Sequence, residues 1–168
     1  EGLTKRFTYD FNHNLTTITD AKGQTFVSNT YTDEKVTQQI WGEGTWNFDY
    51  GLNTATVTDR KGFVTGYQFD TNANIIVKEE FTEGLRPQDP GSFITTYTYN
   101  SLGLRTSITF AKGNGVKFIY DEGNPERRGQ ANLLEIRRKS QMSDPDNDSE
   151  DLISRLTYEP RFNFIKTL

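Results

Sequence analysis

The chain has 168 residues, enough for one domain with a core, and it carries a net charge of −4. The absence of cysteine excludes disulfides, thiolate metal sites and cysteine catalysis, and the negative charge argues against nucleic-acid binding as a global property. Aromatic residues reach 13%, Thr and Asn are plentiful, and no run of 18 apolar residues occurs, so the composition predicts β-structure without a membrane span.

Aromatic residues recur along the chain in pairs two positions apart, the spacing that places both side chains on one face of a strand. The second member of each pair serves as the anchor of a repeating unit, and an acid or amide usually follows it, which favours a turn. The underlying spacing of about 20 residues corresponds to roughly one hairpin per unit. The anchors and the residues after them are Tyr9, Asp10, Tyr31, Phe48, Asp49, Phe69, Asp70, Tyr99, Asn100, Tyr120, Asp121 and Tyr158.

A second motif follows the anchors and consists of a branched aliphatic residue, Thr, two variable residues, Lys and Gly. It occurs at residues 18–23, 57–62 and 108–113. β-Branched residues suit a strand end, and Lys-Gly suits a tight turn because Gly can take a positive φ. The predicted turn glycines, including the one that follows the anchor Tyr99, are Gly23, Gly62, Gly103 and Gly113.

Two insertions interrupt the predicted array, which we expect to occupy residues 1–168 as one domain. Segment 82–93 holds two Pro and two Gly, and segment 141–151 is rich in acidic residues, so both are predicted to be surface loops. Residues 131–139 and 151–156 contain good helix formers, but they are short, and the first alternates apolar with charged residues. We therefore predict strands in both.

Several residues that could support catalysis or metal binding have simpler interpretations. His13 lies in a turn slot, with no evident nucleophile beside it, and is interpreted as a turn residue in place of Gly. Glu79 and Glu80 are adjacent in a predicted strand, so their carboxylates point to opposite faces and cannot jointly flank a glycosidic bond. We expect no catalytic residue and no enzymatic activity.

The acidic insertion alternates like the start of a calcium loop, with acids at positions 144, 146, 148 and 150. Ser149 stands where such a loop needs Gly, and Arg155 stands where it needs Glu. A solvated acidic loop is therefore favoured over a Ca²⁺ site, and no metal or other cofactor is expected.

Two features are candidates for binding, although each also has a structural interpretation that is favoured. The basic cluster could hold an acidic partner or glycan, or it could balance the acidic insertion that follows; it comprises Arg127, Arg128, Arg137, Arg138 and Lys139. Trp41 and Trp46, which flank Gly42 and Gly44, could stack on a sugar or belong to a packed β core.

The repeat has a recognisable relative. Segment 7–23, which begins Phe7-Thr8-Tyr9-Asp10, resembles the YD repeat of the Rhs family. Similar repeats begin at Tyr97 and Tyr120, and Leu156–Asn163 is similar to a recurring Rhs spacer. The resemblance implies a β-sheet ribbon that spirals into a hollow shell, as in Rhs toxins, toxin-complex C components, wall-associated bacterial proteins and teneurin receptors. In the toxins, the shell encloses a C-terminal effector.

The expected fold is therefore all-β, with tandem antiparallel β-hairpins forming a curved, spiralling sheet that is a fragment of an Rhs-type β shell. The second copy departs from the pattern, with Asn29 in place of an aromatic and Thr32 in place of Asp. The chain also lacks an Rhs core motif with the Asp residues used for self-cleavage, and it lacks an effector domain. Neither autoproteolysis nor toxicity is therefore assigned to any residue.

The expected function is to form a structural segment of a shell that encapsulates or scaffolds a toxin or effector, in a secreted or surface-exposed bacterial protein. The alternative is an adhesin-like module that recognises a glycan or a protein partner. The expected partners are neighbouring repeats of a longer chain and an enclosed effector, with no nucleic acid among them. Unpaired sheet edges predict self-association when the chain is isolated.

Overall fold

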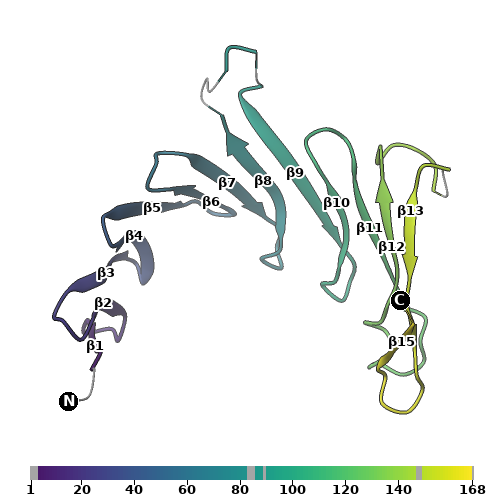
Figure 1. Ribbon diagram of the computed structural model, residues 1–168, viewed down its shortest axis with the longest axis horizontal. Helices are drawn as coiled ribbons and strands as arrows, with labels where there is room; N and C mark the ends of the chain where they lie inside the picture. Colours follow the sequence, from purple (N-terminus) through teal and green to yellow (C-terminus); the bar gives the residue numbers. More distant parts are fainter. Residues whose placement is uncertain (1–3, 83–85, 89, 147–148, 168) are drawn as a thin grey trace. The chain divides into compact units, whose positions relative to one another are not determined.

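A computed structural model describes residues 4–82, 86–88, 90–146 and 149–167 (Figure 1). All regular elements in these ranges are strands, which confirms the all-β prediction. The strands are β1 (Arg6–Tyr9), β2 (Leu15–Thr19), β3 (Thr25–Thr32), β4 (Lys35–Trp41), β5 (Gly44–Tyr50), β6 (Thr54–Thr58), β7 (Val64–Phe69), β8 (Ile75–Phe81), β9 (Ser92–Tyr99), β10 (Arg105–Thr109), β11 (Gly115–Tyr120), β12 (Leu133–Lys139), β13 (Leu152–Arg155), β14 (Thr157–Tyr158) and β15 (Ile165–Thr167).

The sheet topology follows the order of the sequence. Thirteen strands form one sheet in the order β1 to β13, and β14 pairs with β15 in a separate two-stranded sheet. The pairings between β1 and β7 are antiparallel, as are those between β9 and β13. This is the tandem-hairpin arrangement that the repeat predicted. The described residues include no helical segment that could span a membrane.

The segments 131–139 and 151–156, whose composition also suits helices, contain β12 and β13. Glu135 pairs across these strands with Arg155, and Arg138 pairs with Leu152. The alternation of apolar and charged residues therefore decided the local structure, in agreement with the prediction. The first predicted insertion lies between β8, which ends at Phe81, and β9, which begins at Ser92, so its last two residues belong to the strand. The second predicted insertion separates β12 from β13.

The chain divides into two compact units. The first comprises Glu1–Gln68 and Glu79–Ser92, and the second comprises Phe69–Lys78 and Phe93–Leu168. Within the first unit, the register places Val27 opposite Trp41 and Gln39 opposite Trp46. Within the second, it places Lys117 opposite Arg137. These two registers position the side chains of interest in each unit.

Little of the described chain is deeply buried. Val27 and Leu156 are the buried hydrophobic residues in the described ranges, with 2% and 8% of their surface exposed. Most anchor aromatics are half-buried, and Tyr9, on the first strand of the sheet, remains 60% exposed. The anchor aromatics therefore lie on surfaces of the sheet that are only partly buried. The described residues form a sheet whose faces stay largely accessible, without a conventional closed core.

Candidate functional site

The same five-residue turn recurs six times in the described ranges. The backbone N–H of its first residue donates to the carbonyl of the fifth, and the N–H of the fourth donates to the carbonyl of the first, at 2.8 to 3.1 Å. The fourth residue takes a φ of 62 to 87°, the left-handed conformation that hairpin loops with a bulge require. The six turns begin at Asp10, Asp20, Asp59, Asp70, Asn100 and Phe110.

The fourth position of the turn explains the predicted glycines. Gly23, Gly62, Gly103 and Gly113 all occupy it, and they can adopt a positive φ without steric cost. In the first turn the position is held by His13, with a φ of 65° and its N–H 3.1 Å from the carbonyl of Asp10. The structure thus places His13 in the glycine slot of the turn.

The first side chain of the turn organises its backbone. Asp20 Oδ1 accepts hydrogen bonds from the N–H groups of Lys22 and Gln24, both at 2.9 Å. Asp59 binds the equivalent groups of its turn at 2.8 and 3.0 Å, and Asn100 does so at 3.1 and 2.9 Å through its amide oxygen. Phe110 has no such acceptor, so its turn forms through the backbone alone.

At the turns of Asp10 and Asp70, such hydrogen bonds favour the ionised carboxylate. The backbone N–H of Asn14 holds the pKa of Asp10 below its ordinary value, and the side-chain amide of Asn74 does the same for Asp70. In the sequence, the turns after the anchors and the Lys-Gly turns look like two different motifs. They are one motif, and the signal was available because Asp20 precedes Gly23 by the same three positions that separate Asn100 from Gly103.

Tyrosine hydroxyls tie hairpins to the backbone of an earlier strand. Tyr31 donates to the carbonyl of Leu15 at 2.9 Å, and Tyr120 donates to that of Arg105 at 3.0 Å. The acceptor is the first residue of a strand in both cases. Further bonds of this kind join Tyr50 to Val36, Tyr99 to Ile75 and Tyr158 to Leu133.

The third repeat copy is displaced from its predicted position. Asp49 lies inside β5 opposite Thr56, so it does not end the strand, and Tyr50 carries the hydroxyl bond. The chain turns afterwards, where the N–H of Gly51 donates to the carbonyl of Thr54 at 2.9 Å. Because aromatic residues stand at three successive alternate positions, the sequence pattern selected Phe48 as the anchor two residues too early.

Two other anchors differ in detail. Phe69 has no hydroxyl and so cannot form the interstrand bond. Asp121 opens a longer loop, in which its N–H donates to the carbonyl of Asn132 at 3.0 Å. The same turn contact survives within that loop, because the N–H of Asn124 donates to the carbonyl of Asp121 at 3.0 Å.

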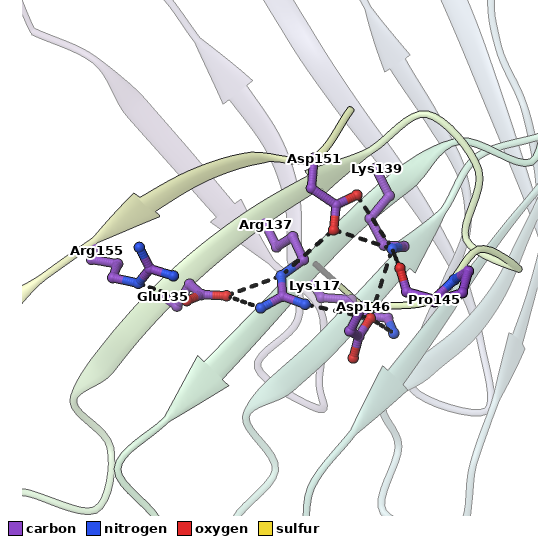
Figure 2. A network of polar contacts seen from close by, with 8 residues as sticks. All are labelled: Lys117, Glu135, Arg137, Lys139, Pro145, Asp146, Asp151 and Arg155. Carbon is purple, nitrogen blue, oxygen red and sulfur yellow. Dashed lines mark hydrogen bonds and ion pairs between the residues drawn. The ribbon is translucent and has the colours of Figure 1, made fainter. Parts of the chain in front are cut away.

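A network of charged side chains is centred on β12, where Glu135, Arg137 and Lys139 are buried. Figure 2 shows its polar contacts. Glu135, Arg137 and Lys139 stand at alternate positions of the strand, so they project to one face. The Arg137 guanidinium donates to Glu135 at 2.5 and 3.0 Å, and Arg155 Nε donates to the other carboxylate oxygen of Glu135 at 3.1 Å.

The acidic insertion supplies the remaining partners of the network. Lys139 Nζ lies 3.3 Å from both carboxylate oxygens of Asp151 and donates to the carbonyl of Pro145 at 2.9 Å. Asp146 lies 2.6 Å from Lys117 Nζ and 3.6 Å from the guanidinium of Arg137. Figure 2 shows these side chains converging from the strands and the insertion.

Electrostatics and burial reinforce the arrangement. The Lys139 side chain is 0% exposed and that of Asp151 is 2% exposed, so each needs the other as a counter-charge. The hydrogen bond to Glu135 raises the pKa of Arg137, and the hydrogen bond from Lys117 lowers the pKa of Asp146. Both shifts favour the charged forms, so the network holds the insertion against β11 and β12.

The structure thus divides the predicted basic cluster. Arg137 and Lys139 join the acidic insertion, which agrees with the interpretation that they balance its charge. Arg128 pairs with Glu126 at 2.9 Å, whereas Arg127 and Arg138 are exposed. Sequence reasoning missed Lys117, whose cross-strand position opposite Arg137 depends on the register of β11 and β12.

The candidate calcium loop is only partly described. Asp146 is engaged by Lys117, while position 148 lies outside the described residues. Within the described ranges, no group of three or more His, Asp or Glu side chains is placed to hold a metal ion. Glu79, the other carboxylate considered, accepts a 2.6 Å hydrogen bond from Ser92.

Two hollows on the described surface are lined by candidate binding residues. One, of about 520 Å³, lies in the second unit between the loop after β11 and segment 156–163. Its polar side chains are largely bound to each other, as in the reciprocal 2.7 Å amide contacts between Asn132 and Asn163. The other, of about 330 Å³, lies in the first unit and is lined by Gln39, Trp41, Trp46 and Arg60.

Comparison with known proteins identifies a shared fold. No protein-family model and no curated protein matches the chain. The crystal structure of TcdB2-TccC3 without its hypervariable C-terminal region matches 99% of this chain with a TM-score of 0.63 and 18% sequence identity. The match spans 9% of that chain, and at this identity it shows the fold alone.

A porin-like protein from Bacteroides uniformis matches 94% of this chain and 77% of its own length, at 11% identity. Its TM-score of 0.32 is too low for a common fold to be inferred. The TcdB2-TccC3 match is therefore the basis for the statement of fold.

Proposed function

We propose that this chain is a structural, non-enzymatic segment of an Rhs-type shell that encapsulates or scaffolds a toxin or effector in a secreted or surface-exposed bacterial protein. The repetition of one turn along successive hairpins carries the proposal. Likeness to TcdB2-TccC3 over 99% of the chain supports it, as does the resemblance of the sequence to YD repeats.

The repeated contacts suit a wall. In the turns that begin with Asp or Asn, that side chain binds the backbone of its own turn, and each linking tyrosine hydroxyl binds a carbonyl of an earlier strand. Such contacts occur between sequence neighbours, so further hairpins can be added without a new type of interaction. The recurring carboxylates therefore have a structural role that needs no substrate.

Protease protection tests the proposal on the full polypeptide that carries this chain. If the repeats form part of a shell, the enclosed segment should survive a non-specific protease until the repeats themselves are cut. The same segment produced without the repeats is the control and should be digested at once. Equal digestion rates for the enclosed and free segments would contradict encapsulation.

The sheet edges bear on the proposed partners. β1 and β13 stand at the two ends of the strand order, so each has one strand neighbour in the 13-stranded sheet. Neighbouring repeats of a longer chain are the natural partners for such edges. In their absence, we expect concentration-dependent self-association, which light scattering coupled to size-exclusion chromatography would detect; a monomer at all concentrations would oppose this.

An adhesin-like binding role is the second candidate. The hollow that contains Trp41 and Trp46 favours it, because large aromatic rings remain accessible there on the sheet surface. A glycan array distinguishes the two roles, since a purely structural wall should bind no glycan selectively.

A further inference from the structure

The hollow in the first unit is created by the register of two strands. Gln39 and Trp41 are two positions apart on β4, and Trp46 lies opposite Gln39 on β5, so all three side chains lie on one face. Arg60, from the turn after β6, completes the lining. The volume of about 330 Å³ is at the lower end of the range for small-molecule sites.

The repeat pattern departs from its usual form at this place. Asn29 stands opposite Gln39, at a position where most other copies carry an aromatic residue. Its amide oxygen accepts a 2.9 Å hydrogen bond from Gln39 Nε2, and its own Nδ2 donates to the carbonyl of Leu15 at 2.9 Å. The substitution that looked like degeneracy in the sequence thus fixes the Gln39 amide, and leaves Gln39 Oε1 as an acceptor.

The indole ring of Trp41 in the hollow is supported by a neighbouring ring but remains accessible to solvent. Trp41 contacts Phe26 edge to face, with ring centroids 6.2 Å apart, yet it remains 59% exposed. Trp46 is half-buried beside it. A rigid indole ring that is supported at its edge and accessible to solvent offers an apolar surface at little conformational cost.

The hollow also contains the side chain of Arg60, whose positive charge is not paired within the described part of the chain. Arg60 is exposed and forms no hydrogen bond or ion pair with the described part of the chain. Its aliphatic stem lies over Gly44, where an added Cβ would come within 2.8 Å of Arg60 Cδ. Glycine at position 44 therefore permits this placement, and the guanidinium keeps its planar set of donors for a carboxylate.

We propose that Gln39, Trp41, Trp46 and Arg60 form a subsite for one acidic sugar unit of a uronic-acid-containing saccharide. The apolar face of the pyranose ring packs on the indole surface, its carboxylate pairs with Arg60, and a hydroxyl donates to Gln39 Oε1. This binding activity goes beyond the structural role proposed above and does not depend on it.

The local backbone argues for a sugar over an extended peptide. Peptides that bind to sheets commonly pair with a free strand edge. Here β4 is paired with β3 and β5, and β5 is paired with β4 and β6, so the strands beneath the hollow offer no free edge. Recognition has to use side chains, and the available set combines aromatic rings, one amide and one cation.

The chain provides its own probe, since its two tryptophans both line the hollow. Titration of the full 168-residue chain with oligogalacturonate should produce a saturable change in tryptophan fluorescence. Neutral galacto-oligosaccharides of equal length should bind at least tenfold more weakly. Added salt should weaken the binding of oligogalacturonate, because it screens the interaction between its carboxylates and Arg60.

Arg60→Ala and Lys61→Ala form a matched pair, because each removes one positive charge from the same exposed turn. We expect Arg60→Ala to lower the affinity for oligogalacturonate at least tenfold and Lys61→Ala to change it less than twofold. Trp41→Ala should also abolish binding, with far-UV circular dichroism to verify folding; the Arg60 variant keeps the test valid if the Trp41 variant unfolds.

Three results would overturn the proposal. They are no saturable fluorescence change with oligogalacturonate, equal affinity for neutral and acidic oligosaccharides, and equal effects of the Arg60 and Lys61 substitutions. Tighter binding of an acidic peptide such as oligoglutamate would also reject the sugar assignment, and would identify the hollow as a protein-binding site.

Discussion

The hydroxyl of Tyr120 donates a 3.0 Å hydrogen bond to the carbonyl oxygen of Arg105, the first residue of β10. The bond joins the end of β11 to the start of its neighbour, outside the ladder that pairs Ser107 with Lys117. Burial also raises the pKa of the Tyr120 hydroxyl, so it remains a donor over the neutral range.

Tyr120→Phe should therefore destabilise the chain by about 1 kcal/mol, the net contribution of one hydrogen bond. Urea unfolding of the 168-residue chain would measure the change. Tyr67→Phe is the matched control, because the Tyr67 hydroxyl has no hydrogen-bond partner in the described part of the chain. Equal decreases in the free energy of unfolding of the two variants would show that the interstrand hydrogen bond does not stabilise the chain.

Phe110→Asp should stabilise its turn. This turn has the backbone bonds of the others, but lacks the side-chain acceptor that Asp20 and Asp59 provide. The new carboxylate should accept the N–H groups of Lys112 and Asn114, and each net hydrogen bond contributes about 1 kcal/mol. Thermal unfolding at neutral pH would measure the gain, and Phe110→Ala should show none.

Ala73→Gly should also be stabilising. Ala73 occupies the fourth position of its turn with a φ of 62°, where a side chain costs about 1–2 kcal/mol relative to Gly. Part of the gain is offset because Gly has more freedom in the unfolded chain. Chemical unfolding should show a net increase, while Gly103→Ala, at the equivalent position, should show a decrease; a stability loss in Ala73→Gly would contradict the strain assignment.

The sequence was sufficient for the hairpin array because its two signals are local. The i, i+2 aromatic spacing and the Asp or Asn before a turn depend only on strand and turn geometry, as at Tyr99, Asn100 and Gly103. The anchor of the third copy was predicted at the wrong residue, because Trp46, Phe48 and Tyr50 all stand at alternate positions of one strand. Only the interstrand hydroxyl bond identifies Tyr50 as the anchor.

The side-chain sites depend on register, which one sequence does not specify. Arg60 meets Trp41 and Trp46 only when β4, β5 and β6 are aligned as observed. Lys117 contacts Asp146, which is 29 positions away in the sequence, because β11 pairs with β12 and the insertion after β12 folds back over them. The sequence identified the indoles and the basic residues as candidates, but their partners followed from the alignment of the strands.

Lys139→Met should be strongly destabilising. The variant leaves Asp151 buried without its nearest counter-charge, and breaking a buried ion pair costs roughly 3 to 5 kcal/mol. The double variant Lys139→Met with Asp151→Leu should recover part of this loss, because both buried charges are removed together. A double-mutant cycle from urea unfolding measures the coupling, and strictly additive losses would show that the pair does not interact.

Lys117→Met should raise the pKa of Asp146. The hydrogen bond from Lys117 is the largest cause that lowers this pKa below 3.8, with smaller contributions from Arg137 and Lys139. A carboxyl whose folded pKa is lowered adds stability above its unfolded pKa and loses it as the pH falls through the folded value. The stability difference between Lys117→Met and the parent chain should therefore be present at neutral pH and shrink in acid.

Asp146 is half exposed, so solvent screens its ion pairs and the stability effect should be modest. The Asp146 carboxyl signal in NMR would report its titration midpoint, and urea unfolding at several pH values would report stability. Lys22→Met is the control, since Lys22 is exposed and its side chain has no partner in the described ranges. If the titration midpoint of Asp146 moved equally in both variants, the loss of any positive charge would explain the shift. The direct contact with Lys117 would then not be its cause.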